Sequence, residues 1–276
     1  MRDVCVIGLG TVGLPTAIYI ATMGEGRFKT YGYDLKPVNS PLVKSTTRWD
    51  RIPHHNISIY VICVWVGLDK DWRPDLTALH DVCEKIAKTN PGALVSIEST
   101  VPPGTCRNIS AKYGLQNIIH VPHRYWAGDP VNHGVRQLRV FGYLNKESMM
   151  KGLIFYRDIL SIPLHVVEPI EVAEMCKIVE NAYRFVQIAF AEELKMICSE
   201  LGLDFESVRS ACNTKWNIEI LEARNGIGGK CLPKDIRFLI SLCKKVKPFL
   251  LKSAIKTDEV YKRWVRRIGK EGVALA

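Results

Sequence analysis

The sequence lacks the features that mark membrane-spanning and secreted proteins. Its most apolar window, "SIYVICVWVG", is far shorter than the roughly 20 residues that a helix needs to cross a bilayer. The amino terminus, "MRDVCVIGLG", reaches glycine within a few residues and has no signal-peptide pattern. Internal repeats and low-complexity segments are also missing. These absences predict a globular, cytoplasmic protein.

Paired cysteines are missing as well. The nine cysteines form no CxxC pair, and their number is odd. This pattern disfavours both a disulfide framework and a structural zinc site. His54 and His55 are adjacent in a loop, which is typical of surface histidines, and no metal site is predicted. Most cysteines should behave as small buried apolar residues. Cys231 differs from them because it lies in a segment of glycines and lysines.

The charge is unbalanced towards the basic side. Lysine and arginine total 38 against 28 acidic residues, which gives a net charge of +10. Such an excess favours an anionic partner such as a nucleotide, a sugar phosphate or nucleic acid. Much of it lies in residues 244–270, where a solvated helix face is the simpler explanation. Without a recognisable binding motif, nucleic acid is an unfavoured partner.

Apolar, β-branched segments alternate with helical segments through the first part of the chain. The expected helices include 75–88 and 146–160. The expected strands after the first are 29–34, 57–66, 93–99, 117–122, 137–143 and 163–168. This alternation predicts an α/β fold with a Rossmann-like, doubly wound parallel sheet.

From Glu168 onward the pattern becomes helical. One run of some thirty residues, "PIEVAEMCKIVENAYRFVQIAFAEELKMICSELG", has no internal breaker, and two or three further helices follow. We expect an NAD-binding domain over 1–167, an all-α domain built on the long helix over 168–268, and the start or remnant of another domain over 269–276. The long helix is a natural surface for a homodimer.

A dinucleotide turn is the first candidate site. Gly8, Gly10 and Gly13 fit G-x-G-x-x-G between an expected strand and helix, and Asp34 ends the next strand. The glycines would let a pyrophosphate approach the helix amino terminus, and the acidic residue would bind the ribose hydroxyls. Asp34 would also repel a 2′-phosphate, which favours NAD over NADP. The alternative is a Rossmann-like fold that binds no dinucleotide. Thr11, Val12 and Lys36 complete the predicted contacts in this region.

Polar residues form one stripe on the long helix. Glu174, Lys177, Asn181 and Arg184 are spaced by three, four and three residues and therefore share a face. Such a stripe on a mostly apolar helix either meets water or lines a site. The spacing alone favours the solvated face.

The segment "NGIGGKCLPKD", residues 225–235, is the most unusual in the chain. A phosphate loop would require glycine at Arg224 and a hydroxyl at Cys231, so that reading fails. Positive charge on Lys230 and Lys234 would stabilise a Cys231 thiolate, which could trap an aldehyde covalently. A packed, inert thiol is the alternative. We expect the next helix to start near Pro233, with Asp235 in its first turn.

Four motifs, in order, resemble the UDP-glucose/GDP-mannose dehydrogenase family of nucleotide-sugar dehydrogenases. They are "VIGLGTVGLP" at 6–15, "STVPPGT" at 99–105, "EMCKIVENAYRFVQIAFAEEL" at 174–194 and "GIGGKCLPKD" at 226–235. The "ENAYR" wording looks nearer to the N-acetylhexosamine branch than to the UDP-glucose branch.

The resemblance implies a four-electron oxidation of a UDP- or GDP-linked sugar alcohol to a carboxylate with two NAD+ in turn, as in polysaccharide biosynthesis. It implies that Cys231 is the nucleophile, and that Lys177 and Asn181 steady the oxyanion. It implies a general-base role for Asp235 and a water-ordering role for Thr100. Thr100 and Lys234 are also expected to contact NAD. The resemblance therefore implies that the polar stripe of the long helix lines the active site rather than a solvated face.

Several departures from the family bear on function. His123, in "HVPHRYWAGD", replaces the family's catalytic glutamate and either acts as the base or marks its loss. "VWVGL" replaces the family's V-T-P turn, and the connection after Asp34 is short. The family's third domain, which holds the substrate nucleotide, should begin where this chain stops. Three explanations for the missing third domain are open: truncation, a partner chain that completes the site, and a changed substrate. We expect "GVALA", residues 272–276, to be paired, covered or poorly ordered.

The leading function is therefore an NAD-dependent nucleotide-sugar 6-dehydrogenase, or its amino-terminal part. A β-hydroxyacid dehydrogenase is the alternative enzyme, because those enzymes have a similar length and carry a lysine and an asparagine on the long helix. A decayed NAD-binding or dimer-forming subunit is the non-enzymatic alternative.

Overall fold

The computed structural model describes residues 2–274, and the side chains of residues 2–268. The chain folds into two compact units. The first runs to Asp69 and continues over Pro74–Lys177, and the second comprises Lys70–Arg73 and the chain from Ile178. The division falls inside the long helix, later than residue 167. The first turns of that helix belong to the first unit because Ile170 and Ala173 contact Gly142 of its sheet.

An eight-stranded sheet forms the centre of the first unit, in the order β10-β9-β8-β7-β4-β1-β2-β3. Its strands are β1 Asp3–Ile7, β2 Thr30–Tyr33, β3 Lys44–Thr46, β4 Ile57–Ile62, β7 Leu94–Ile97, β8 Ile118–His120, β9 Arg139–Tyr143 and β10 Leu164–Val167. The predicted α/β, Rossmann-like class is confirmed. A separate hairpin pairs β5 Gly67–Leu68 with β6 Pro74–Asp75, and short 3-10 turns lie at Trp49–Arg51 and His54–Asn56.

The sheet is mixed rather than fully parallel as expected. β8 and β9 pair antiparallel, whereas β9 and β10 pair parallel. Parallel neighbours need a crossover connection, which is usually a helix. Residues 121–138 between β8 and β9 contain no helix, and this part of the chain returns antiparallel.

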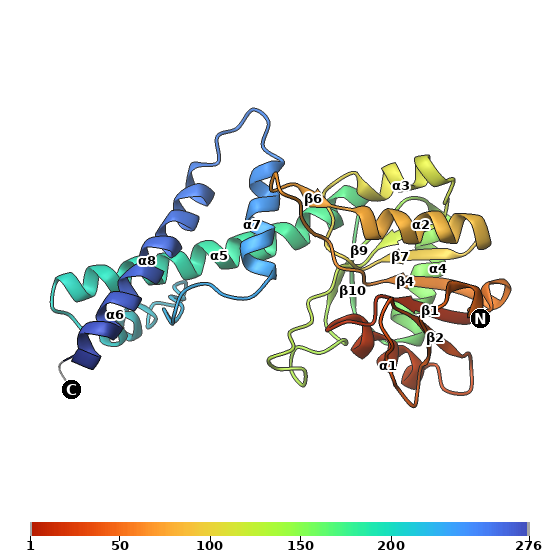
Figure 1. Ribbon diagram of the computed structural model, residues 1–276, viewed down its shortest axis with the longest axis horizontal. Coiled ribbons are helices and arrows are strands. Elements are labelled where there is room, and N and C mark those ends of the chain that lie inside the picture. The colour runs from red at the N-terminus through yellow and green to blue at the C-terminus, as the bar shows by residue number, and fades with distance from the viewer. Residues whose placement is uncertain (1, 275–276) are drawn as a thin grey trace. The chain divides into compact units, whose positions relative to one another are not determined.

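Helices cover both faces of this sheet (Figure 1). α1 Gly13–Met23 lies on one face with α4 Lys146–Leu153, which continues as the π-helical turn η3 Ile154–Ile159. α2 Thr77–Thr89 and α3 Thr105–Tyr113 lie on the other. The central strand β1 is buried on both sides, which explains its continuous run of apolar residues, "VCVI".

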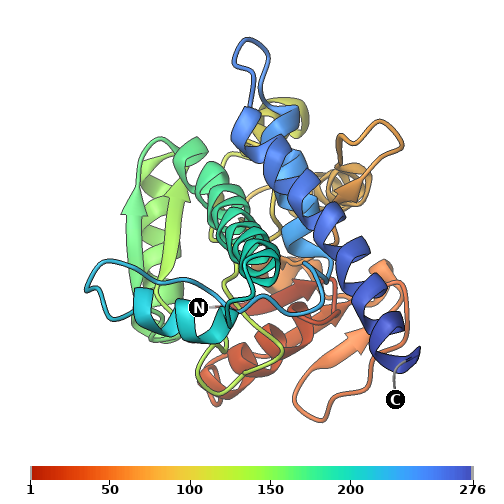
Figure 2. The ribbon, with the colours of Figure 1, turned by 90° about the vertical axis from the view of Figure 1, so that its left-hand side faces the viewer.

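The second unit is helical. α5 Ile170–Glu200 is one unbroken helix, as predicted, and it is followed by α6 Phe205–Cys212, α7 Cys231–Ser241 and α8 Phe249–Ala274. α5 and α8 pack together through two apolar clusters, one around Phe185 and Ala254 and one around Cys198 and Tyr261 (Figures 1 and 2). Gly202, with φ +68°, follows the end of α5, where a left-handed residue stops a helix.

The expectation that residues 272–276 are paired, covered or poorly ordered stays a prediction, because their side chains lie outside the described part of the chain. α8 continues to Ala274, so residues 272–274 of "GVALA" are helical, and residues 275 and 276 lie outside the described residues. None of the described helices is long and apolar enough to cross a membrane.

Candidate active site

The glycine turn between β1 and α1 is closed on one side and open on the other. Gly8 has φ +86°, and a Cβ there would lie 2.8 Å from the carbonyl oxygen of Cys63. A Cβ on Gly13 would lie 1.7 Å from the carbonyl oxygen of Gly8. Gly10 is exposed, and a Cβ there would meet nothing within 4 Å. The open side at Gly10 is where a pyrophosphate can approach the amino terminus of α1, so these residues fit NAD.

Asp34 follows β2 and is held beside this turn. The backbone N–H of Leu9 donates to its Oδ2 at 2.7 Å, and the N–H of Lys36 donates to its Oδ1 at 3.0 Å. A carboxylate has about four acceptor positions, so these two bonds leave capacity for ribose hydroxyls. The predicted turn and its acidic partner are therefore brought together. Thr11 is exposed and Val12 is half-buried within the turn.

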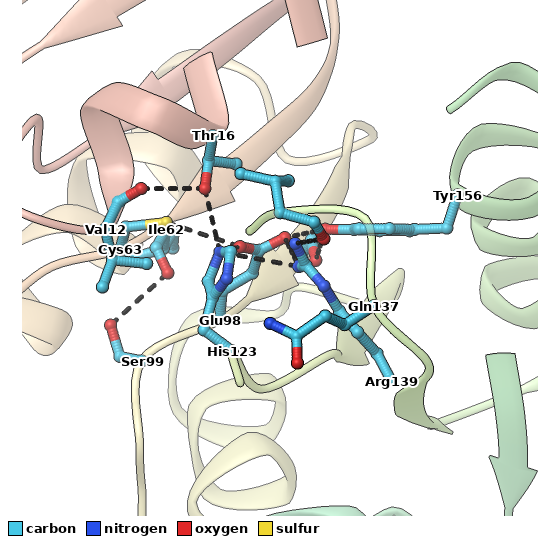
Figure 3. A network of polar contacts seen from close by, with 12 residues as sticks. Val12, Thr16, Ile62, Cys63, Glu98, Ser99, His123, Gln137, Arg139 and Tyr156 are labelled. Carbon is cyan, nitrogen blue, oxygen red and sulfur yellow. Dashed lines mark hydrogen bonds and ion pairs between the residues drawn. The ribbon is translucent and has the colours of Figure 1, made fainter. Parts of the chain in front are cut away.

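A buried ionic network joins side chains that follow β4, β7 and β8 to Arg139, the first residue of β9 (Figure 3). Glu98 Oε1 accepts from Arg139 Nη1 at 3.1 Å and from the Tyr156 hydroxyl. Glu98 Oε2 contacts His123 Nε2 and accepts from the Cys63 thiol at 3.6 Å. These side chains come from segments far apart in sequence, and together they satisfy a carboxylate that is 3% exposed.

The charges in this network are set by burial and by Arg139. Burial alone would raise the pKa of Glu98, but positive charge, from His123 when that ring is protonated and from Arg139 throughout, outweighs burial and lowers this pKa. Burial also lowers the pKa of His123, and the Arg139 charge lowers it further against the opposing pull of Glu98. At neutral pH, Glu98 is therefore an anion paired with Arg139, and His123 is a neutral imidazole.

Cys63, Glu98 and His123 have atoms of metal-ligand type within 4.8 Å of one another. Zinc uses such donors. The Arg139 guanidinium, however, already supplies the positive charge at Glu98. We therefore assign the cluster to hydrogen bonding. No motif singled out Glu98, Arg139 or Tyr156, although a charge inside the apolar segments "LVSIES" and "LRVFGY" signals a buried ion that needs a partner.

Cys231 is the first residue of α7 and its thiol is exposed. The helix starts two positions before the expected Pro233, which puts the sulfur at the amino terminus of an eleven-residue helix. Gly226 and Gly229 lie in the loop that precedes Cys231. Their φ angles of +95° and +75° belong to a backbone conformation that favours glycine. The packed-thiol alternative does not fit an exposed Cys231.

α8 fixes the loop that leads to Cys231. The N–H of Ile227 donates to Asp258 Oδ1 at 2.7 Å, and Lys262 Nζ donates to the carbonyl of Ile227 at 2.8 Å. The Tyr261 hydroxyl donates to the carbonyl of Arg224 at 2.6 Å. A Cβ on Gly226 would lie 2.4 Å from the Lys262 side chain, so this contact explains the glycine. No sequence motif pointed to these α8 residues.

Three of the predicted site residues meet within the helical unit. Asn181 Nδ2 donates to Asp235 Oδ2 at 2.5 Å, and Lys234 Nζ bonds to Asp235 Oδ1. Asp235 and Lys234 are buried, at 1% and 7% exposed. Lys177 is half-buried and lies one helical turn before Asn181 on α5.

The polar stripe of α5 is not a uniform face. Glu174 is buried, and its carboxylate accepts from the N–H groups of Gly104 and Cys106 at 2.6 and 2.7 Å. It caps the start of α3 and has a structural role there. Arg184 is exposed. Thr100 is half-buried in the segment between β7 and α3.

Known proteins share this arrangement of domains. The model of the UDP-glucose/GDP-mannose dehydrogenase family NAD binding domain matches residues 36–160, and that of the family's central domain matches residues 171–259. A UDP-N-acetyl-D-mannosamine dehydrogenase of Pyrococcus horikoshii is 30% identical, over 99% of this chain and 69% of that protein. The chain belongs to the UDP-glucose/GDP-mannose dehydrogenase family. The predicted NAD cofactor is thereby confirmed, although the glycine turn itself precedes the matched range.

Solved structures of this dehydrogenase family share the fold. The structure of UDP-D-ManNAc dehydrogenase from Pyrococcus horikoshii superposes with a TM-score of 0.86 at 27% identity, over 99% of this chain and 72% of that one. A UDP-N-acetyl-D-mannosamine dehydrogenase of Methanocaldococcus jannaschii is 30% identical over 89% of this chain and 63% of its own length. The chain thus spans between 63% and 69% of the length of these two curated relatives.

Proposed function

We propose that this chain oxidises the primary alcohol of a nucleotide-linked N-acetylhexosamine to a carboxylate through a covalent intermediate on Cys231. The observation that carries the proposal is the exposed Cys231 thiol at the amino terminus of α7, one turn before Asp235, which is bonded to Asn181. The names of the relatives, UDP-N-acetyl-D-mannosamine dehydrogenases, support the substrate class.

The reaction consumes one water and two NAD+ for each alcohol. NAD+, held at the turn of Gly8, Gly10 and Gly13 with Asp34, would supply the hydride acceptor for both oxidation steps. The alcohol first loses a hydride and a proton to give an aldehyde. The Cys231 thiolate then adds to the aldehyde carbon, and the thiohemiacetal loses a second hydride to become a thioester. Water cleaves the C–S bond, which releases the carboxylate and restores the thiol.

The polar residues of α5 and α7 are assigned to the charges that develop. Lys177 and Asn181 would stabilise negative charge on the sugar oxygen in both oxidations, as donors held in place before the reaction. Asp235, which is bonded to Asn181 and Lys234, would accept protons from the alcohol and from the attacking water. We assign Thr100 to ordering that water.

The test compares two exposed cysteines. Among the described residues, only Cys212 and Cys231 are exposed cysteines, so Cys212→Ser is a matched control for Cys231→Ser. With NAD+ and UDP-N-acetyl-D-mannosamine, the wild type and Cys212→Ser should form two NADH per sugar, and Cys231→Ser should stop after at most one. Iodoacetamide should abolish turnover in both active proteins. Turnover that resists alkylation, or four-electron oxidation by Cys231→Ser, would contradict the covalent route and favour a β-hydroxyacid dehydrogenase type of enzyme.

A further inference from the structure

The proton on the His123 ring can be assigned from its neighbours. Thr16 Oγ1 donates its single proton to the carbonyl of Val12 at 2.9 Å, and it lies 3.0 Å from His123 Nε2 (Figure 3). Thr16 must therefore accept from Nε2. The same nitrogen also has Arg139 Nη1 at 3.5 Å, but the ionised Glu98 lies closer to it, and a carboxylate beside an imidazole lone pair would be repelled. Nε2 of His123 thus carries the hydrogen, and Nδ1 does not.

This assignment leaves His123 poorly suited to act as a base. Its Nε2–H is engaged with Glu98 and Thr16. Its Nδ1 is buried and has no hydrogen-bond partner in the described part of the chain. Protonation at Nδ1 would bury a new N–H donor without an acceptor and add a positive charge beside Arg139.

The contacts of His123 lead to the cofactor turn instead. Thr16 lies in the first turn of α1, and Val12, whose carbonyl it binds, is inside the glycine turn. Cys63 also connects Glu98 to the glycine turn. The Cys63 thiol donates to Glu98, and the Cys63 carbonyl oxygen and Cβ lie directly beneath Gly8 and Gly13. The buried Glu98 anion is thus connected to both ends of the turn.

We propose that His123 is a positioning residue for NAD, which anchors the glycine turn to Glu98 by donating from Nε2 to Thr16 and Glu98. The proposal rests on NAD binding at this turn and does not depend on the chemistry of Cys231. A loss of the Nε2 donor should loosen the amino terminus of α1 and weaken dinucleotide binding before any sugar is present.

The test measures the dissociation constant of NAD+ by calorimetry on the full chain, without a sugar substrate. His123→Gln keeps an amide donor near the position of Nε2 and should bind NAD+ within about threefold of the wild type. His123→Leu and Thr16→Val each remove one partner of a buried hydrogen bond and should weaken binding by roughly tenfold. Thr16→Ser keeps the hydroxyl and should bind like the wild type.

A double variant and a turnover measurement distinguish the positioning role of His123 from a role as a base. The double variant His123→Leu/Thr16→Val should weaken binding no more than His123→Leu alone, because Thr16→Val removes a hydrogen bond that His123→Leu has already broken. Thr16→Val is nearly isosteric, so it tests the proposal even if His123→Leu does not fold. Unchanged NAD+ binding in folded Thr16→Val and His123→Leu overturns the proposal. Loss of turnover in His123→Gln with intact NAD+ binding would instead make His123 a base. Cys231→Ser should bind NAD+ normally, which separates this test from that of the proposed oxidation.

Discussion

Asn181 on α5 donates a 2.5 Å hydrogen bond from its side-chain amide to Oδ2 of Asp235 on α7. The other carboxylate oxygen of Asp235 is bonded to Lys234, so the proposed base has a partner on each oxygen. The side chains of Asp235 and Lys234 are both buried. With little water to replace a lost hydrogen bond, the orientation of Asp235 depends on the Asn181 amide.

Replacement of Asn181 should therefore impair the chemistry more than the binding of NAD+. Asn181→Ala removes a donor to Asp235 and, in the proposed mechanism, to the reacting oxygen. We expect kcat to fall by about 10²-fold with an unchanged NAD+ dissociation constant. Steady-state kinetics and calorimetry measure the two quantities. An equal loss in both would place Asn181 in cofactor binding instead.

Asn181→Asp is the matched charge variant. It would set a second carboxylate at hydrogen-bonding distance from Asp235, and two such groups cannot both ionise easily. The value of kcat should then fall at least as far as in Asn181→Ala, with an unchanged NAD+ dissociation constant. A kcat equal to that of the wild type would mean that Asp235 does not depend on the amide donor.

The α8 contacts to the cysteine loop predict a stability effect that can be measured without substrate. Tyr261→Phe keeps the buried ring but removes the hydroxyl that donates to the carbonyl of Arg224. The free energy of unfolding should fall by about 1 kcal/mol, measured by urea denaturation. Because the loop leads directly to Cys231, the rate of Cys231 alkylation should change as well. Tyr183→Phe, at an exposed tyrosine of α5, is the control and should leave both quantities unchanged in protein diluted to the monomer.

The features that the sequence predicts well are those set by neighbouring residues. The glycine turn with Asp34 and the unbroken α5 follow from spacing and periodicity, because both depend on local geometry. The antiparallel β9 does not follow, since residues 121–138 carry no regular pattern. The pairing of Glu98 with Arg139 and that of Ile227 with Asp258 on α8 could not be predicted either. The residues of these two pairs lie 41 and 31 positions apart in the sequence. Such pairs form only through the tertiary fold.

Glu192 on α5 predicts a pH dependence of stability. Both of its carboxylate oxygens are buried without a hydrogen-bond partner in the described part of the chain. Burial, reinforced by the nearby Asp258 charge and opposed by Lys262, raises its pKa to about 8. The folded state therefore keeps a proton that the unfolded state releases near its ordinary pKa of about 4.3. Stability from this group is complete below about pH 4.3 and is lost as the pH rises towards 8.

Glu192→Gln should remove that dependence, because the amide is neutral throughout and has almost the same shape. We expect the melting temperature of the wild type to fall relative to that of Glu192→Gln between pH 5 and pH 8, with the variant the more stable protein at pH 8. Differential scanning at several pH values measures this difference. Parallel curves over the whole range would show that Glu192 is not protonated in the folded state.

An exposed apolar stripe on α5 predicts self-association of the chain. Val179, Tyr183, Phe190 and Ile197 are between 40% and 63% exposed, and their spacing of four, seven and seven residues places them on one face of the helix. Contiguous apolar side chains at an interface are stabilised by removal from water. The self-complementary use of one such face by two chains gives a homodimer. We expect Phe190→Glu to shift the mass measured by light scattering from dimer towards monomer at micromolar concentration. Lys215→Glu, on a different segment, changes a surface charge without touching the stripe and should leave the mass unchanged. A wild type that is monomeric at high concentration would contradict the prediction.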